Sequence, residues 1–206
     1  MSATTKILLA ILGVFLLIGL GAILWAVGSY NNLVTLQQGT DQQWAQVQNV
    51  YQRRADLIPN LVNTVAGAAN FEKSTLTAVT DARASVGRVQ LPPNSAPADA
   101  NQLAAFDRAQ GQLGAALSRL LVVSERYPQL TATANFRDLQ AQLEGTENRI
   151  SVERGRFNDA VLAYNTATRR FPGVLIAGIF RFAPRPYFTA APGAETSPKV
   201  DFGGKF

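Results

Sequence analysis

The sequence predicts an all-α protein, in which an N-terminal transmembrane helix continues into an elongated antiparallel four-helix bundle with an apolar-basic C-terminal tail. Three observations predict this class. Residues 7–27 carry no charged side chain. Later stretches place apolar residues at three- and four-residue steps, as helices with one buried face do, and most prolines fall between those stretches. We expect an anchor over residues 1–29, a bundle over 30–171 and a tail over 172–206.

The uncharged run predicts a membrane anchor. A helix rises about 1.5 Å per residue, so the run spans roughly 30 Å, the thickness of the hydrocarbon core of a bilayer. Trp25 and Tyr30 lie at its far end, where amphipathic rings favour the headgroup layer. The alternative is a cleaved signal peptide, because residues 26–28 resemble a small-x-small cleavage site. A signal has an apolar region of only ~7–15 residues, which favours a retained anchor.

The charges around the anchor predict its orientation. Lys6 is the only charged side chain near the span, and residues 28–40 carry none. Cations stay in the cytoplasm, so we expect most of the chain to lie outside it. A cytoplasmic placement stays open, because a cluster of arginines near residue 175 resembles a segment that contacts anionic lipid of the inner leaflet.

The first two helical segments meet near Pro59. Either Asp56 caps a new helix there, or Pro59 kinks one long helix; the sequence does not separate these. The second segment is predicted from about residue 57 to residue 86. The third covers residues 103–124 and shows the clearest seam for packing against neighbouring helices, of the kind found in coiled coils: Leu103, Phe106, Gln110, Leu113, Leu117, Leu120 and Ser124.

The fourth segment, residues 135–170, is long enough for a rod of ~54 Å. Short loops between long helices favour antiparallel neighbours, so the fourth helix should end near the lipid surface, at Phe171. Residues 174–182 are apolar and then basic. They predict either an interfacial segment or a cap over the open end of the bundle. The membrane-contact candidates are Trp25, Arg181 and Arg185.

Composition excludes several functions. The chain has no Cys and no His, which removes disulfides, Cys/His zinc sites, thiol nucleophiles and imidazole bases. The net charge is +5, but the cations alternate with acids along the helices, so we expect no nucleic-acid partner. No phosphate-binding or nucleophile motif is present. We therefore expect no catalytic, cofactor-binding or metal-binding residues and no cofactor.

The polar residues on the helices are more typical of ion pairs than of catalysis. The candidates are Arg53, Arg54, Asp56, Glu144, Glu147, Glu153 and Asp159. An all-carboxylate calcium or magnesium site stays open, but no acidic run has the ligand spacing of such a loop. We expect Glu147 and Arg154 to join Arg53 or Arg54 in a partly buried network that fixes helix register.

Blocks of residues along the chain resemble the LemA family. The anchor is followed by Tyr30-Asn31-Asn32-Leu33-Val34, then by Gln52-Arg53-Arg54-Ala55-Asp56-Leu57-Ile58-Pro59-Asn60-Leu61-Val62, and the closing block is Pro198-Lys199-Val200-Asp201-Phe202. The resemblance covers nearly the whole chain. The family-motif or structural residues are Tyr30, Asn31, Trp44, Arg53, Arg54, Asp56, Pro59, Asn60, Tyr127, Pro128, Glu147, Asn148, Arg154, Asn158, Tyr164 and Asn165.

The resemblance implies a helical bundle of bacterial membranes without an assigned biochemical activity, and some relatives are linked to building magnetosome membranes. We expect a non-catalytic, self-associating scaffold or adaptor in the bacterial inner membrane, mostly periplasmic. Its expected partners are the lipid bilayer, further copies of itself and an unidentified membrane or periplasmic protein. The alternative is a membrane-organising or membrane-remodelling protein; a metal-dependent hydrolase is less favoured.

Overall fold

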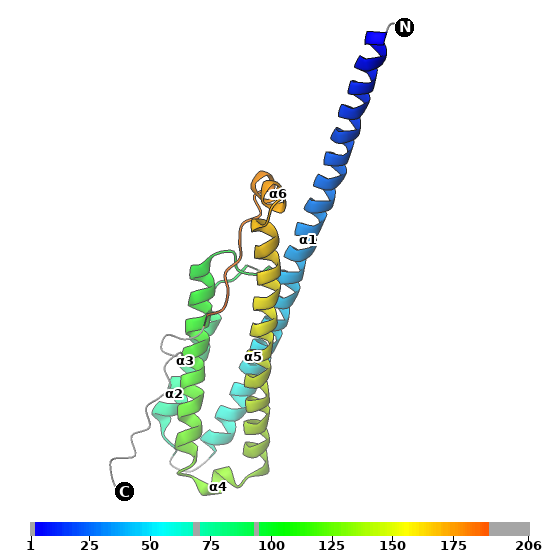
Figure 1. Cartoon of the computed structure of the whole chain (residues 1–206). Helices are drawn as coiled ribbons and strands as arrows, with labels where there is room; N and C mark the ends of the chain where they lie inside the picture. The colour runs from blue at the N-terminus through cyan, green and yellow to red at the C-terminus, as the bar shows by residue number, and fades with distance from the viewer. Residues whose placement is uncertain (1–2, 68–70, 93–94, 190–206) are drawn as a thin grey trace, which may run out of the picture.

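Helices are the only regular secondary structure in the computed structural model, which describes residues 3–67, 71–92 and 95–189 (Figure 1). This confirms the all-helical class. The elements are α1 (Ala3–Ala66), α2 (Lys73–Gly87), α3 (Ala100–Ser124), α4 (Pro128–Thr131), α5 (Ala134–Arg169) and α6 (Gly173–Phe180).

Helix α1 is continuous through Pro59, which decides between the two alternatives at this residue. Asp56 does not cap a new helix; its carboxylate accepts a hydrogen bond from Gln52 within α1 (2.7 Å). Pro59 has no N–H to donate to the carbonyl of Ala55, and Arg83 of α2 donates to that oxygen instead (Nε–O 3.3 Å). The predicted start of the second segment is therefore wrong, because residues 57–66 complete α1 and α2 begins only at Lys73.

The third and fourth segments form where their seams predict. Asp99 caps α3 by accepting from the N–H of Asn101 (2.9 Å), and Thr133 caps α5 by accepting from the N–H of Phe136 (3.3 Å). All seven predicted seam residues of α3 are buried. Between the two helices, where the sequence predicted only a break, Pro128 opens the single turn of α4.

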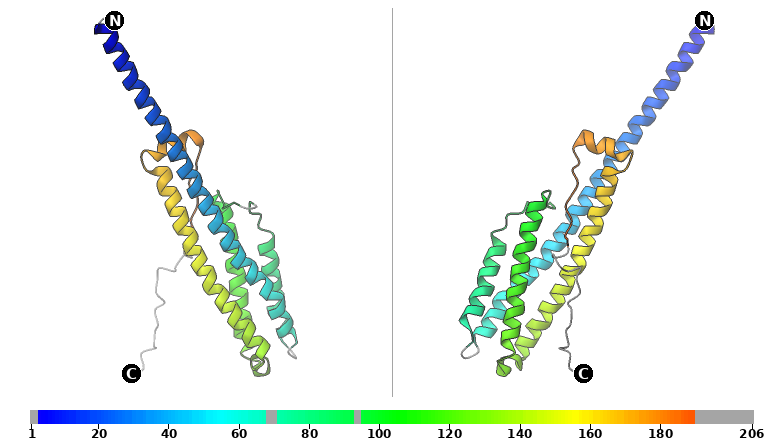
Figure 2. Two further views of the ribbon diagram at one scale, coloured as in Figure 1. Left: turned by 90° about the vertical axis from the view of Figure 1, so that its right-hand side faces the viewer. Right: turned by 60° about the vertical axis from the view of Figure 1, so that its left-hand side comes forward.

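Four helices form an elongated helical body of two pairs (Figures 1 and 2). Helix α1 packs along α5, and α2 packs along α3. Three apolar clusters follow one another along α1: Leu33 lies in the first, Trp44 to Tyr51 in the second, and Ile58 to Val65 in the third. Trp44 is fully buried against the rings of Phe106, Phe157 and Phe188, so large side chains join the two pairs.

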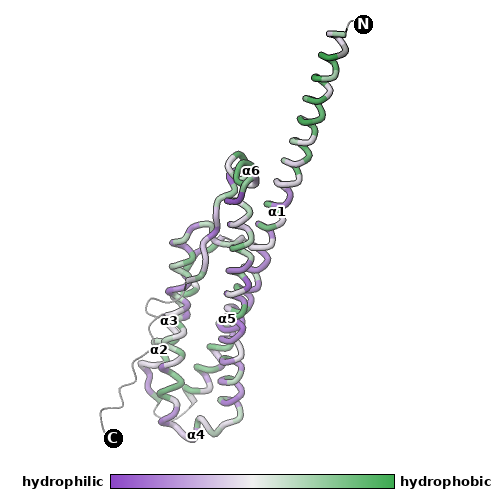
Figure 3. Tube along the Cα trace, in the orientation of Figure 1, coloured by the Kyte–Doolittle hydropathy of each residue, from purple (hydrophilic) through white to green (hydrophobic). Residues whose placement is uncertain are grey.

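The N-terminal part of α1 extends beyond the helical body and is mostly apolar (Figure 3). It is the one helix in the described part of the chain that is long and apolar enough to cross a membrane, and none of its most apolar 18-residue window is buried. Leu17, for example, is 70% exposed. The length and exposure of this run support the predicted anchor.

The tail returns to the helical body. Helix α6 lies against α1 where α1 leaves the body, and Ile176 and Ala177 are buried beside Leu33 (Figure 1). Residues 181–189, here called the tail segment, then run back along the body until Phe188 enters the second cluster. Residues 173–189 therefore cover part of the core. The closing family block, residues 198–202, lies outside the described residues.

The buried seam of α3 generates a stability prediction. Leu117 is 3% exposed, so Leu117→Ala should lower the free energy of unfolding by about 2–5 kcal/mol. Leu162→Ala is the control, because Leu162 is 57% exposed. Thermal unfolding of the full chain measures both variants. Equal, small shifts of Tm for the two would show that the Leu117 face of α3 is not a packing seam.

Candidate functional site

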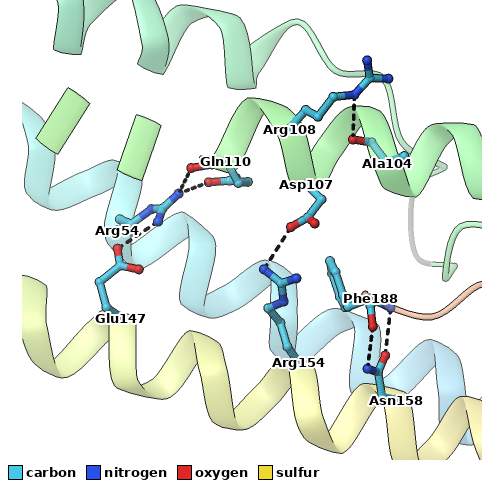
Figure 4. A network of polar contacts seen from close by, with 9 residues as sticks. All are labelled: Arg54, Ala104, Asp107, Arg108, Gln110, Glu147, Arg154, Asn158 and Phe188. Atoms are coloured by element: carbon cyan, nitrogen blue, oxygen red, sulfur yellow. Dashed lines mark hydrogen bonds and ion pairs between the residues drawn. The ribbon is translucent and has the colours of Figure 1, made fainter. Parts of the chain in front are cut away.

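A buried charge separates the second and third apolar clusters. Arg54 of α1 is 3% exposed and lies between Tyr51 and Ile58. Its Nη1 donates to Oε1 of Glu147 on α5 (2.8 Å), and its Nη2 donates to the backbone carbonyl of Gln110 on α3 (3.0 Å) and to the side-chain oxygen of Gln110 (Figure 4). We call Arg54, Gln110 and Glu147 the polar layer.

The polar layer has a structural consequence. A guanidinium stays charged in proteins, and burying it is costly unless its donors are paired. Only one arrangement of α1, α3 and α5 brings a carboxylate, a carbonyl and a carboxamide to Arg54 together. Slipping one helix by a turn would move these acceptors away from Arg54, so we expect the layer to favour this helix register. Of the two arginines expected there, Arg54 takes this place, and Arg53 is exposed.

Arg154 lies outside the polar layer that it was expected to join. It forms an ion pair with Asp107 of α3 (2.9 Å) and lies over the ring of Phe188 (4.3 Å to the centroid). Seven residues of helix separate Arg154 from Glu147, about 10 Å along α5. Burial raises the pKa of the nearby Tyr51 phenol, an effect that the Arg154 charge partly opposes.

Three motif residues of α5 bind the tail segment. The side-chain amide of Asn158 donates to the carbonyl of Phe188 (2.9 Å) and accepts from its N–H (2.9 Å) (Figure 4). Asn165, two turns later, makes the same pair with Arg185, at 2.9 and 2.8 Å. The Tyr164 hydroxyl donates to the carbonyl of Ala183 (3.1 Å). Each asparagine side chain thus pairs with one backbone N–H and one backbone C=O of the tail segment, as a neighbouring strand would.

The sequence suggested Arg185 as a membrane-contact residue, but its side chain lies within the helical body. Its side chain is 11% exposed; Nη1 donates to the carbonyl of Ala96 (2.6 Å), and Nη2 lies 3.9 Å from the Asp41 carboxylate. Asp41 also accepts from the N–H of Ala96 (2.8 Å). Burial raises the pKa of Tyr164, and the Arg185 charge partly opposes this. Sequence reasoning missed Asp41, Ala96 and Phe188; the only available signal was Pro184-x-Pro186, which is typical of extended backbone.

The other predicted site residues lie apart from these contacts. Tyr30 packs against Phe180, with ring centroids 4.8 Å apart, and Tyr127 packs against Phe71 at 4.9 Å. Trp25 is 40% exposed on the anchor. The exposed positions are Asn31, Arg53, Asp56, Pro59, Asn60, Asn148 and Arg181.

The structure offers little to a metal or substrate. Among the described residues, no group of three or more Asp and Glu side chains is placed to hold a metal ion. An open groove of about 510 Å³ lies between α3 and α5, lined partly by Glu144, Glu147 and Asn148. Glu147 already binds Arg54, and Glu144 accepts from Gln140 (3.1 Å). Both carboxylates that line the groove are therefore paired within the chain.

The sequence model of the LemA family matches residues 43–202, which include the polar layer and the residues that bind the tail segment. The chain belongs to the LemA family. This confirms the resemblance seen in the sequence.

The curated relatives of this LemA-family chain include magnetosome proteins. Magnetosome protein MamQ 1 and MamQ 2 of Paramagnetospirillum magneticum are each 28% identical to it over 182 residues, covering 81% of this chain and 67% of theirs. Magnetosome protein MamQ of Magnetospirillum gryphiswaldense is 27% identical over the same coverage. Neither the family description nor these names specify an enzymatic activity.

The contacts of the polar layer predict that replacing Arg54 lowers the stability of the protein. Arg54→Ala leaves Gln110 buried without its donor, so the free energy of unfolding should fall by about 1–3 kcal/mol. Arg126→Ala is the control: Arg126 pairs with Glu72 at 2.7 Å but is 62% exposed, and such pairs contribute about 0–1 kcal/mol. Denaturant unfolding measures both. If Arg54→Ala cost no more than the control, the layer would not fix the register.

The contacts of the tail segment predict a local effect. Asn165→Ala removes the partners of the Arg185 N–H and carbonyl, so the Arg185 amide should exchange its hydrogen faster, as should neighbouring amides of residues 183–188. Asn148→Ala, at an exposed position of the same helix, should leave their exchange unchanged. Equal exchange in both variants would mean that Asn165 does not hold the tail segment.

Proposed function

We propose that this chain is a membrane-anchored, non-catalytic scaffold or adaptor, built as an elongated antiparallel four-helix bundle on its transmembrane helix. The observation that carries the proposal is that several family-motif residues bind other parts of the same chain. Arg54, Asn158 and Asn165 are paired with other parts of the chain, so these polar groups are not free to bind a substrate. A rod whose polar residues fix its own shape is suited to presenting a surface at a set distance from the membrane.

The scaffold is further proposed to lie in the bacterial inner membrane with its bundle in the periplasm. Lys6 beside the apolar run supports this orientation. Its partners are proposed to be further copies of this chain and a membrane or periplasmic protein. A membrane-organising role is the second candidate, supported by the similarity to proteins named for the magnetosome.

Self-association is supported by exposed apolar side chains outside the core. Trp44 and Tyr51 fill the core, so they offer nothing to a second copy. Exposed apolar side chains remain on α5, where Val152 is 51% and Leu162 is 57% exposed. Anchoring confines the rods to two dimensions, which raises their effective concentration and allows a weak lateral interface to assemble.

Cysteine crosslinking in native membranes tests self-association, and the chain's lack of cysteine makes single substitutions clean. Single cysteines at Gln42, Gln43, Ala45, Gln46, Gln48 and Asn49, which point in different directions around α1, should give dimers whose yield varies with the helical period. Val47→Cys is the control, because Val47 is 0% exposed. Uniform crosslinking, or none at any position, would contradict self-association through this helix.

A further inference from the structure

Five large apolar side chains stand exposed where α1 leaves the helical body. Ile179 and Phe180 of α6 are 71% and 55% exposed. We define the base patch as Phe171, Val174, Leu175, Ile179 and Phe180. Figures 1 and 3 show the apolar helix α6 at the end of the body beside α1. Exposed apolar clusters of this kind mark contact surfaces.

Contacts between α6 and α1 determine where the base patch lies relative to the bilayer. Helix α6 packs on Leu33, with Ala26 at the edge of the same cluster, and Phe180 packs on Tyr30. The apolar run of the anchor ends at Val27, and six residues of helix from Val27 to Leu33 span about 9 Å. If α1 crosses the bilayer along this run, α6 lies at the boundary between acyl chains and headgroups.

The charges around the base patch have one sign. Arg169, Arg170 and Arg181 are exposed, and none of them takes part in an ion pair within the described residues. The sequence holds no acidic residue before Asp41 and none between Asp159 and Glu195. Arg181 also adopts a left-handed backbone conformation (φ 57°) at the end of α6, where glycine is the usual residue.

We propose that α6 is a second membrane contact, in which the base patch enters the interface of the bilayer that α1 crosses and the three arginines bind anionic lipid headgroups. This contact is additional to the scaffold role. It fixes the tilt of the rod against the membrane surface, because two separate elements then hold the body to the same bilayer.

A lipid surface fits the base patch better than a second copy does. In a symmetric dimer the same patch meets itself, which would bring three arginines of one copy against three of the other. Anionic phosphates complement that charge. The bilayer is also held beside α6 by the anchor, so no association from solution is needed.

The test uses the full chain in nanodiscs that contain phosphatidylglycerol, with a cysteine at Ile179 or at Val122. Both residues are 71% exposed, but Val122 lies near the far end of α3, which makes it a matched control. Immersion of large apolar side chains should slow alkylation by a charged water-soluble maleimide at position 179 by about tenfold or more relative to position 122. A fluorophore at position 179, but not at 122, should be quenched by nitroxide-labelled lipid.

The charge arm uses Arg169→Gln, Arg170→Gln and Arg181→Gln together in the Ile179→Cys background. Protection in anionic nanodiscs should fall by about fivefold or more, toward the unprotected rate at position 122, and should change little in phosphatidylcholine alone. The matched control replaces three exposed arginines of the distal half, Arg119, Arg137 and Arg149, by Gln and should leave protection unchanged.

Two outcomes would overturn the proposal. Equal alkylation and absent quenching at positions 179 and 122 would place α6 in water. Protection at position 179 without lipid quenching, accompanied by disulfide-linked dimers of Ile179→Cys, would assign the base patch to a second copy. Crosslinking along residues 42–49 of α1 tests self-association through that helix separately.

Discussion

The buried charge of Arg54 is the constraint on which the arrangement of the helices depends. The α1–α5 and α2–α3 pairs each pack closely, but the two pairs meet through long side chains. The buried guanidinium of Arg54 adds a directional requirement to these contacts, because its acceptors on α3 and α5 must lie within hydrogen-bond distance. The bonds from Arg54 to Glu147 and Gln110 therefore set how α1 is aligned with both α5 and α3.

The tail segment depends on that alignment. Asn158 and Asn165 are two turns apart on α5 and present their carboxamides to residues 188 and 185. Arg185 reaches Asp41 on α1 and the backbone of Ala96, so the tail segment joins both helix pairs. Phe188 completes the cluster around Trp44 and lies under Arg154. The same path leaves α6 folded beside α1 at the start of the body.

The sequence predicted those features that repeat along a helix and missed those that pair distant residues. The α3 seam from Leu103 to Ser124 is buried as its spacing predicts, because one face of a helix must leave water. Pro59 did not end its helix, since Arg83 replaces the lost hydrogen-bond donor from another helix. The ion pair of Arg54 and Glu147 was among the predicted networks, but the pairing of Arg154 with Asp107 and the internal role of Arg185 needed the fold.

Together these contacts make the helical body a rigid continuation of the predicted anchor, with α1 as the shared element. Residues 28–40 determine whether this connection is rigid, because they join the exposed apolar run to the packed body. The helix is continuous there. The most direct measurement is amide hydrogen exchange of the full chain in nanodiscs. We predict that residues 28–40 exchange as slowly as residues 44–58 of the core. Rapid exchange confined to residues 28–40 would show a flexible linker and contradict the account.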